Sequence, residues 1–194
     1  MEKLTEQNYI DAAESLNCEV AVIKAVDYVE SRGSGFNKDG SLIILFEPHL
    51  FWKNLRLFDI DPNKYLKNNP DLLSPVWNPK LYGKYSQQWN KMTRAMKIQP
   101  EAAMLSASYG RFQILGSNYH LCRMDDVRQF IEFMKMSEVN QLMCFVDFVI
   151  NTYLDDELRA LDFSGFARGY NGPLYWKNNY DKKLLNAYNK FKQR

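Results

Sequence analysis

Residues 20–36 read Val20-Ala21-Val22-Ile23-Lys24-Ala25-Val26-Asp27-Tyr28-Val29-Glu30-Ser31-Arg32-Gly33-Ser34-Gly35-Phe36, and no other stretch constrains the chain as tightly. Its first part is apolar at almost every position, which favours a buried helix from about residue 19 to 30. Gly33 and Gly35 end that helix. Glu30 therefore stands where a buried helix meets a glycine-rich loop.

This position of Glu30 suits a general acid. Apolar neighbours raise the pKa of a carboxyl group, the helix end fixes the side chain, and the loop is expected to leave space for a ligand. The alternative is a helix-terminal Glu in a surface salt bridge, which is the usual role of Glu. The cost of two flexible glycines beside Glu30 argues for the functional interpretation.

The bulk composition indicates a soluble globular protein. The chain has 194 residues, 46% hydrophobic and 25% charged, which is enough for one domain, or a large lobe with a small one. A net charge of +2 argues against nucleic-acid binding but is compatible with an anionic polymer. Aromatic residues reach 14%, and a few of them could line a carbohydrate groove, although most are expected in the core.

Metal and disulfide chemistry are not expected. Cys18, Cys122 and Cys144 are odd in number and match no metal or redox motif, so we predict reduced, mostly buried thiols. His49 and His120 are too few for a typical zinc site, and no cofactor is implied. The first residues have no apolar signal core, and no run approaches the length of a membrane span.

The pattern along the chain predicts an α+β fold that is mainly α-helical. A turn at residues 38–41 followed by the apolar run 42–46 predicts a small β-hairpin near residues 36–47. The proline-rich residues 56–83 are expected to be loop, and Thr5 is expected to cap the first helix without a capping-box partner at Asn8. Helices are expected at residues 5–16, 19–30, 48–55, 86–97, 100–107, 126–136, 138–153, from 155, 163–170 and 180–192.

Glu47 is a second carboxylate in an unusual place. It follows the apolar run 42–46 and precedes Pro48, which fits the first turn of a helix. A charge at the end of a buried strand needs a partner or a role. Two interpretations stay open: a structural contact at the helix start, or the second carboxylate of a glycosidase pair. Asp39 is a weaker rival, because Asp is common in turns for local reasons.

Two further polar breaks are candidates for binding. In the stretch at residues 108–114, Ser108 and Gln113 could hydrogen-bond a sugar and Tyr109 could stack on it; the alternative is a capped helix start with a core aromatic. Tyr170-Asn171-Gly172 is a similar break late in the chain. Arg111 and Arg168 could each pair with a carboxylate.

Four motifs occur in a fixed order along the chain. They are Val29-Glu30-Ser31-Arg32-Gly33-Ser34-Gly35-Phe36, Ile44-Leu45-Phe46-Glu47-Pro48-His49, Ala107-Ser108-Tyr109-Gly110-Arg111-Phe112-Gln113-Ile114-Leu115-Gly116 and Phe166-Ala167-Arg168-Gly169-Tyr170-Asn171-Gly172-Pro173. Together they resemble the N-acetylmuramidase family of phage endolysins and, more distantly, the lysozyme-like superfamily. The resemblance covers roughly residues 8–190.

The resemblance implies a lysozyme-like fold and cleavage of the β-1,4 bond from N-acetylmuramic acid to N-acetylglucosamine. Glu30 matches the catalytic Glu of the family, and Glu47 and His49 match positions typical of it. Tyr109 stands where Trp is more usual. The candidate site residues are Glu30 and Glu47 for catalysis and Ser108, Tyr109, Gln113, Tyr170, Asn171 and His49 for substrate binding.

The resemblance also sets expectations for organisation and partners. Residues 1–194 are expected to be one catalytic domain without a separate wall-binding module, acting as a monomer on peptidoglycan glycan strands. The expected location is the host bacterial cytoplasm, with access to the wall through a separate pore. Two other activities stay open: a lytic transglycosylase that forms anhydro sugars, and a non-catalytic peptidoglycan-binding protein.

Overall fold

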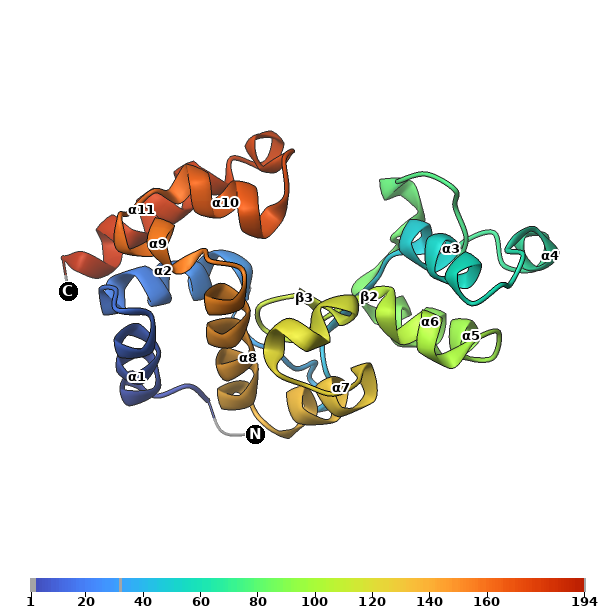
Figure 1. Cartoon of the computed structure of the whole chain (residues 1–194), viewed down its shortest axis with the longest axis horizontal. Coiled ribbons are helices and arrows are strands. Elements are labelled where there is room, and N and C mark those ends of the chain that lie inside the picture. Colours follow the sequence, from blue (N-terminus) through green and yellow to red (C-terminus); the bar gives the residue numbers. More distant parts are fainter. Residues whose placement is uncertain (1–2, 32, 194) are drawn as a thin grey trace.

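The computed structural model of the protein describes residues 3–31 and 33–193, so Arg32 of the first motif lies outside the described residues. Figure 1 shows two groups of helices with a small sheet between them. The terminal group consists of α1 (Glu6–Leu16), α2 (Val20–Glu30), α8 (Glu138–Asn151), α9 (Asp155–Arg159), α10 (Phe163–Asn171) and α11 (Tyr180–Lys192). The central group consists of α3 (Pro48–Leu57), α4 (Asn63–Leu66), α5 (Gln88–Met96) and α6 (Pro100–Leu105).

The remaining elements among the described residues are a small sheet, α7 (Val127–Met136) and four short 3₁₀ helices. The sheet contains β1 (Ile44–Phe46), β2 (Ala107–Tyr109) and β3 (Ile114–Leu115), and α7 packs on α8. Short 3₁₀ helices are η1 (Pro79–Leu81), η2 (Tyr85–Gln87), η3 (Gly116–Cys122) and η4 (Tyr175–Asn178). The predicted class, α+β and mainly helical, is confirmed. None of the described helices is long and apolar enough to cross a membrane.

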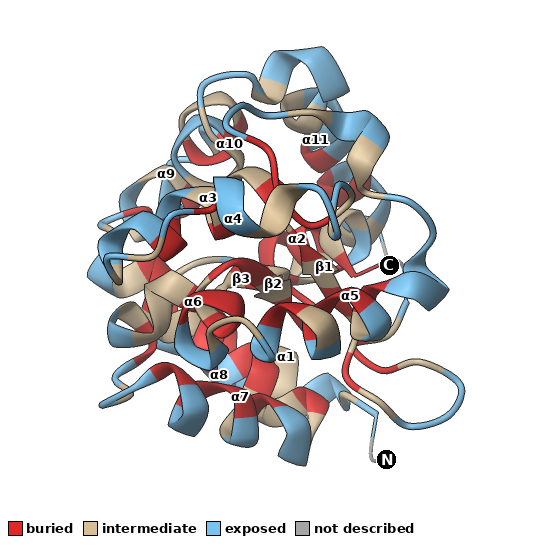
Figure 2. Ribbon diagram, turned by 90° about the vertical axis from the view of Figure 1, so that its right-hand side faces the viewer, coloured by how far each residue is buried: buried red, intermediate tan, exposed pale blue. Residues whose placement is uncertain are grey.

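Helix α2 forms as predicted and is buried along most of its length. Val22, Ile23, Ala25 and Val26 are fully buried, and α11 and α1 pack along the helix. Burial of each large aliphatic side chain contributes about 1.5–3 kcal/mol, so packing rather than intrinsic propensity stabilises this helix. Figure 2 shows buried residues on the sheet and on the helix faces around it.

The start of α1 corrects one expectation. Asn8 completes a capping box with Thr5: the Thr5 N–H donates to Asn8 Oδ1 at 2.8 Å, and the Asn8 N–H donates to Thr5 Oγ1 at 3.4 Å. The amide oxygen of Asn supplies the same acceptor that Glu or Gln supplies at this position.

The hairpin near residues 36–47 is one edge of a larger sheet. The predicted turn forms, with Asp39 accepting the Ser41 N–H at 2.9 Å, but only a single bridge joins Phe36 to Leu42. The principal partner of β1 is β2, with Leu45 opposite Ser108, and β3 pairs on the other side of β2. The local turn chemistry was visible in the sequence, whereas the pairing of β1 with a distant strand was not.

Residues 56–83 are more ordered than the predicted loop. They contain the last residues of α3 and all of α4 and η1. A buried lysine of α5 forms hydrogen bonds to the backbone of the second half of this segment. Lys91 is only 4% exposed, and its Nζ donates to the carbonyls of Asp71 at 3.3 Å, Tyr82 at 3.1 Å and Leu81. Three carbonyls match the three N–H groups of an ammonium, which makes its burial tolerable.

Candidate functional site

Glu30 is the last residue of α2 and is half-buried. Asn171 Nδ2, at the end of α10, donates to Glu30 Oε1 at 3.0 Å. Burial raises the pKa of the Glu30 carboxyl group, while the Asn171 hydrogen bond and the positive charge of Lys183 partly offset that rise. The first and last motifs of the sequence therefore meet at one carboxyl group.

Tyr170 positions Asn171 from the core. Its hydroxyl donates to the carbonyl of Phe112 at 2.7 Å, and its ring packs against Phe145, Phe148 and Phe166. The Tyr170 ring thus serves packing, while the adjacent Asn171 contacts Glu30. The Oδ1 atom of Asn171 is buried and has no hydrogen-bond partner among the described residues. That unsatisfied acceptor beside Glu30 is suited to a donor from a ligand or from a protonated carboxyl group.

Glu47 belongs to the other side of the molecule. Glu47 is the N-cap residue of α3, but its side chain makes no hydrogen bond to the first turn of that helix. Instead, its Oε2 accepts a hydrogen bond from the hydroxyl of Tyr82. His49 Nδ1 lies 3.5 Å from the same oxygen. Burial raises the pKa of the Glu47 carboxyl group and the Tyr82 hydrogen bond lowers it; burial also lowers the pKa of His49.

Tyr109 has no exposed ring face, contrary to the expectation that it could stack on a sugar. It is fully buried, its hydroxyl donates to the carbonyl of Met104 at 2.8 Å, and its ring meets Phe130 edge to face. Adjacent residues of a strand point to opposite faces, so Ser108 and Tyr109 cannot both face a ligand. Ser108 is the half-buried member of the pair.

Gln113 lies in the turn between β2 and β3. Its backbone has φ +50°, a conformation that Gln adopts infrequently, and its Nε2 donates to the carbonyl of Gly110 at 2.8 Å. The amide thus stabilises its own turn while the residue stays half-buried.

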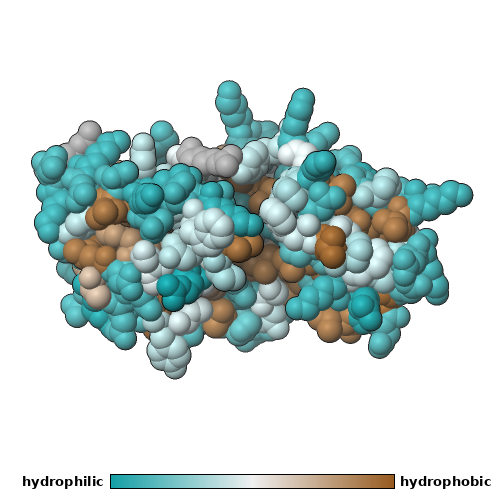
Figure 3. Space-filling view, turned by 90° about the horizontal axis from the view of Figure 1, so that it is seen from above, coloured by the Kyte–Doolittle hydropathy of each residue, from teal (hydrophilic) through white to brown (hydrophobic). Residues whose placement is uncertain are grey.

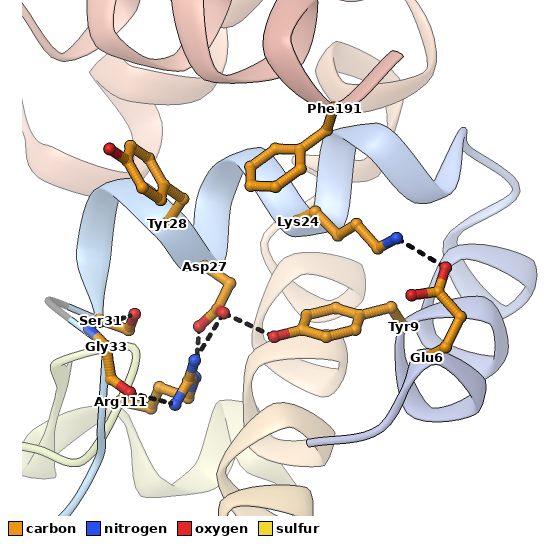
Figure 4. A pocket seen from close by; sticks show the side chains of 9 residues that line it. All are labelled: Glu6, Tyr9, Lys24, Asp27, Tyr28, Ser31, Gly33, Arg111 and Phe191. Carbon is orange, nitrogen blue, oxygen red and sulfur yellow. Dashed lines mark hydrogen bonds and ion pairs between the residues drawn. The ribbon is translucent and has the colours of Figure 1, made fainter. Parts of the chain in front are cut away.

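Arg111 pairs with carboxylates, as the sequence suggested, but not with the candidate catalytic ones. It binds both oxygens of Asp27, and its NH1 donates to Glu138 at 3.0 Å and to the carbonyl of Gly33 at 3.2 Å. Figure 4 shows the contacts of Arg111 with Asp27 and Gly33 beside a cavity of about 860 Å³. Gly33, Asp27 and Arg111 line that cavity, and no predicted site residue does.

The two candidate catalytic residues come from different helical groups. Glu30 and Asn171 come from α2 and α10, Glu47 and His49 come from the start of α3, and the sheet lies between these elements (Figure 1). The space-filling view shows the surface hollowed in the middle, with apolar residues at the floor (Figure 3). Within residues 3–31 and 33–193, no three His, Cys, Asp or Glu side chains gather as a metal site would require.

Glu30 and Glu47 are two half-buried carboxyl groups from different helical groups, and a pair of carboxyl groups is what most glycoside hydrolases use. The sequence model of the N-acetylmuramidase family matches residues 19–192, and the chain belongs to that family of glycoside hydrolases. The crystal structure of a Burkholderia AP3 phage endolysin superimposes with a TM-score of 0.87 at 31% identity, covering 98% of this chain and 72% of that chain. A comparison with curated proteins finds no match.

Proposed function

We propose that the protein hydrolyses the β-1,4 bond between N-acetylmuramic acid and N-acetylglucosamine, with Glu30 as the general acid. The burial of Glu30 beside Asn171 carries the proposal, because a raised pKa keeps a carboxyl group protonated at a pH where an exposed one is ionised. A protonated Glu30 would donate its proton to the leaving glycosidic oxygen. The family supports peptidoglycan as the substrate.

Glu47 is proposed to act as the second carboxylate. Its hydrogen bond from Tyr82 favours the ionised form. An ionised Glu47 would stabilise the oxocarbenium-like transition state or activate water. His49, Ser108, Gln113 and Asn171 are proposed to contact the glycan, while Tyr170 is proposed to act by holding Asn171.

The biological setting proposed is that of a phage endolysin. The likeness to the Burkholderia phage enzyme supports this, as does the family. An endolysin made inside the host would act on the wall after release through a separate pore.

Mass spectrometry of digested sacculi tests the reaction. Hydrolysis yields muropeptides with a new reducing end, whereas a lytic transglycosylase yields anhydro muropeptides that are lighter by one water. Anhydro products would contradict hydrolysis. Binding to sacculi without release of any reducing sugar would contradict both enzymatic activities.

Asn171→Ala is expected to shift the pH profile of the enzyme. The Asn171 hydrogen bond lowers the pKa of Glu30, so its loss raises that pKa further. A general acid loses activity as pH rises through its pKa, so the alkaline limb of kcat/KM should move to higher pH. Lysis rates measured across pH on outer-membrane-stripped cells report this shift, with Asn178→Ala, an exposed position in η4, as the control. A profile unchanged by the Asn171 substitution would contradict the assignment of Glu30.

A further inference from the structure

The hydrogen bond from Tyr82 to Glu47 has a fixed direction. Trp77 Nε1 donates to the hydroxyl oxygen of Tyr82 at 2.9 Å, and an indole nitrogen can only donate. The Tyr82 hydroxyl therefore accepts from Trp77, and its single proton is free to point at Glu47 Oε2. Trp77 thus orients the hydroxyl, and the hydroxyl in turn fixes one oxygen of Glu47.

The segment that carries Tyr82 is hydrogen-bonded to the end of β1, directly before Glu47. Gln88 is 1% exposed; its Oε1 accepts the N–H of Phe46 at 2.9 Å, and its Nε2 donates to the carbonyl of Tyr82 at 2.8 Å. Lys91 holds the same carbonyl at 3.1 Å. One buried amide therefore joins the residue before Glu47 to the backbone of Tyr82, so the distance between the two side chains is set by packed structure.

We propose that Tyr82, oriented by Trp77, is a positioning residue that holds the Glu47 carboxylate for the reaction. The proposal rests on the proposed role of Glu47. Tyr82 comes from the proline-rich segment before α5, outside the four sequence motifs, and nothing in the pattern of that segment marks it.

The other groups around Glu47 do not replace Tyr82. His49 comes from α3, and its lowered pKa favours the neutral imidazole at neutral pH. Lys91 of α5 is occupied by three carbonyls. Among the described residues, neither a Lys nor an Arg forms an ion pair with Glu47. Burial raises the pKa of Tyr82, which keeps its hydroxyl protonated as a donor.

Tyr82→Phe tests the proposal, because it removes one oxygen and keeps the ring. We expect kcat on dye-labelled sacculi to fall about tenfold with KM nearly unchanged, in line with the loss of a hydrogen bond to a charged group. The same loss should raise the pKa of the Glu47 carboxyl group, because the Tyr82 hydrogen bond lowers it; ¹³C NMR of Glu side chains, with Glu47→Gln for assignment, measures this pKa. The acid limb of activity should move to higher pH with it.

Trp77→Phe should shift the pH profile of activity in the same direction but by less, because it removes the hydrogen bond that orients the Tyr82 hydroxyl and leaves the hydroxyl itself in place. Tyr153→Phe, at an 81% exposed ring, is the matched control and should leave kcat and the profile unchanged. If Tyr82→Phe stays folded and neither the Glu47 titration nor kcat differs from wild type, the positioning role is wrong. A near-wild-type Glu47→Gln enzyme would instead refute the role of Glu47 itself, which separates the two failures.

Discussion

Glu30→Gln is expected to reduce the rate of sacculus digestion by about 10²–10⁴-fold, the usual contribution of a general acid. Gln keeps the shape of the side chain and can still accept the hydrogen bond from Asn171 Nδ2, but it cannot give up a proton. The loss should fall on kcat, because the substitution leaves the groove unchanged. Initial rates on dye-labelled sacculi over a range of substrate concentrations separate the two parameters.

The same substitution should stabilise the fold at neutral pH. Burial raises the pKa of Glu30 in the folded state, so ionisation of Glu30 costs stability as pH rises through that pKa, and Gln removes the cost. Glu30→Gln should therefore melt at a higher temperature than wild type at neutral pH, and the gain should vanish below the usual Glu pKa of 4.5. A loss of activity that accompanied a fall in Tm would point to misfolding instead.

Glu101→Gln is the matched control for Glu30→Gln. Glu101 is exposed in the first turn of α6, so neither the rate nor Tm should change beyond small surface effects. Near-wild-type digestion by folded Glu30→Gln would refute the assignment of Glu30 as the general acid, whatever the effect on Tm.

The sequence pointed to the two candidate carboxyl groups but not to most of their surroundings. Glu30 was identified because local features mark it: an apolar helix, a helix end and two glycines in succession. Its partner Asn171 lies 141 positions away, so the four ordered motifs suggested a shared site but local chemistry could not supply the contact. Tyr82, the neighbour of Glu47, was missed because the prolines around it indicate only a loop.

The two glycines of the loop differ in their surroundings. Gly33 lines the cavity of about 860 Å³, whereas a Cβ at Gly35 would lie only 1.8 Å from Gln141 Oε1. The Gly35 N–H donates to Glu138 at 2.8 Å. Gly35 is thus required for a close approach to α8, and the loop is held against α8 as well as against Arg111. A sequence pattern indicates that a glycine is required at a position, but it does not identify the neighbouring residue that leaves no room for a side chain.

Arg111→Met is expected to destabilise the protein by about 3–5 kcal/mol, because it breaks a buried ion cluster from one side. Asp27 and Glu138 are 5% and 4% exposed, and both lose their cationic partner. The hydrogen bond from Tyr9 to Asp27, at 2.7 Å, cannot replace a positive charge. Urea unfolding followed by circular dichroism measures the loss.

Arg123→Met shows what the loss of an ordinary ion pair costs. Arg123 pairs with Asp147 at 2.9 Å, but its side chain is 66% exposed, so its removal should cost less than about 1 kcal/mol. Neutralising the two stranded acids, with Asp27→Asn and Glu138→Gln added to Arg111→Met, should recover part of the stability, because the cost comes from uncompensated charge rather than from lost packing. Equal losses of stability for Arg111→Met and Arg123→Met would contradict this account.

The ion cluster also holds the end of α2 that carries the proposed acid. Asp27 lies one helical turn before Glu30, and Arg111 donates to the carbonyl of Gly33 in the loop after Glu30. Unfolding of this cluster should therefore release that end of the helix.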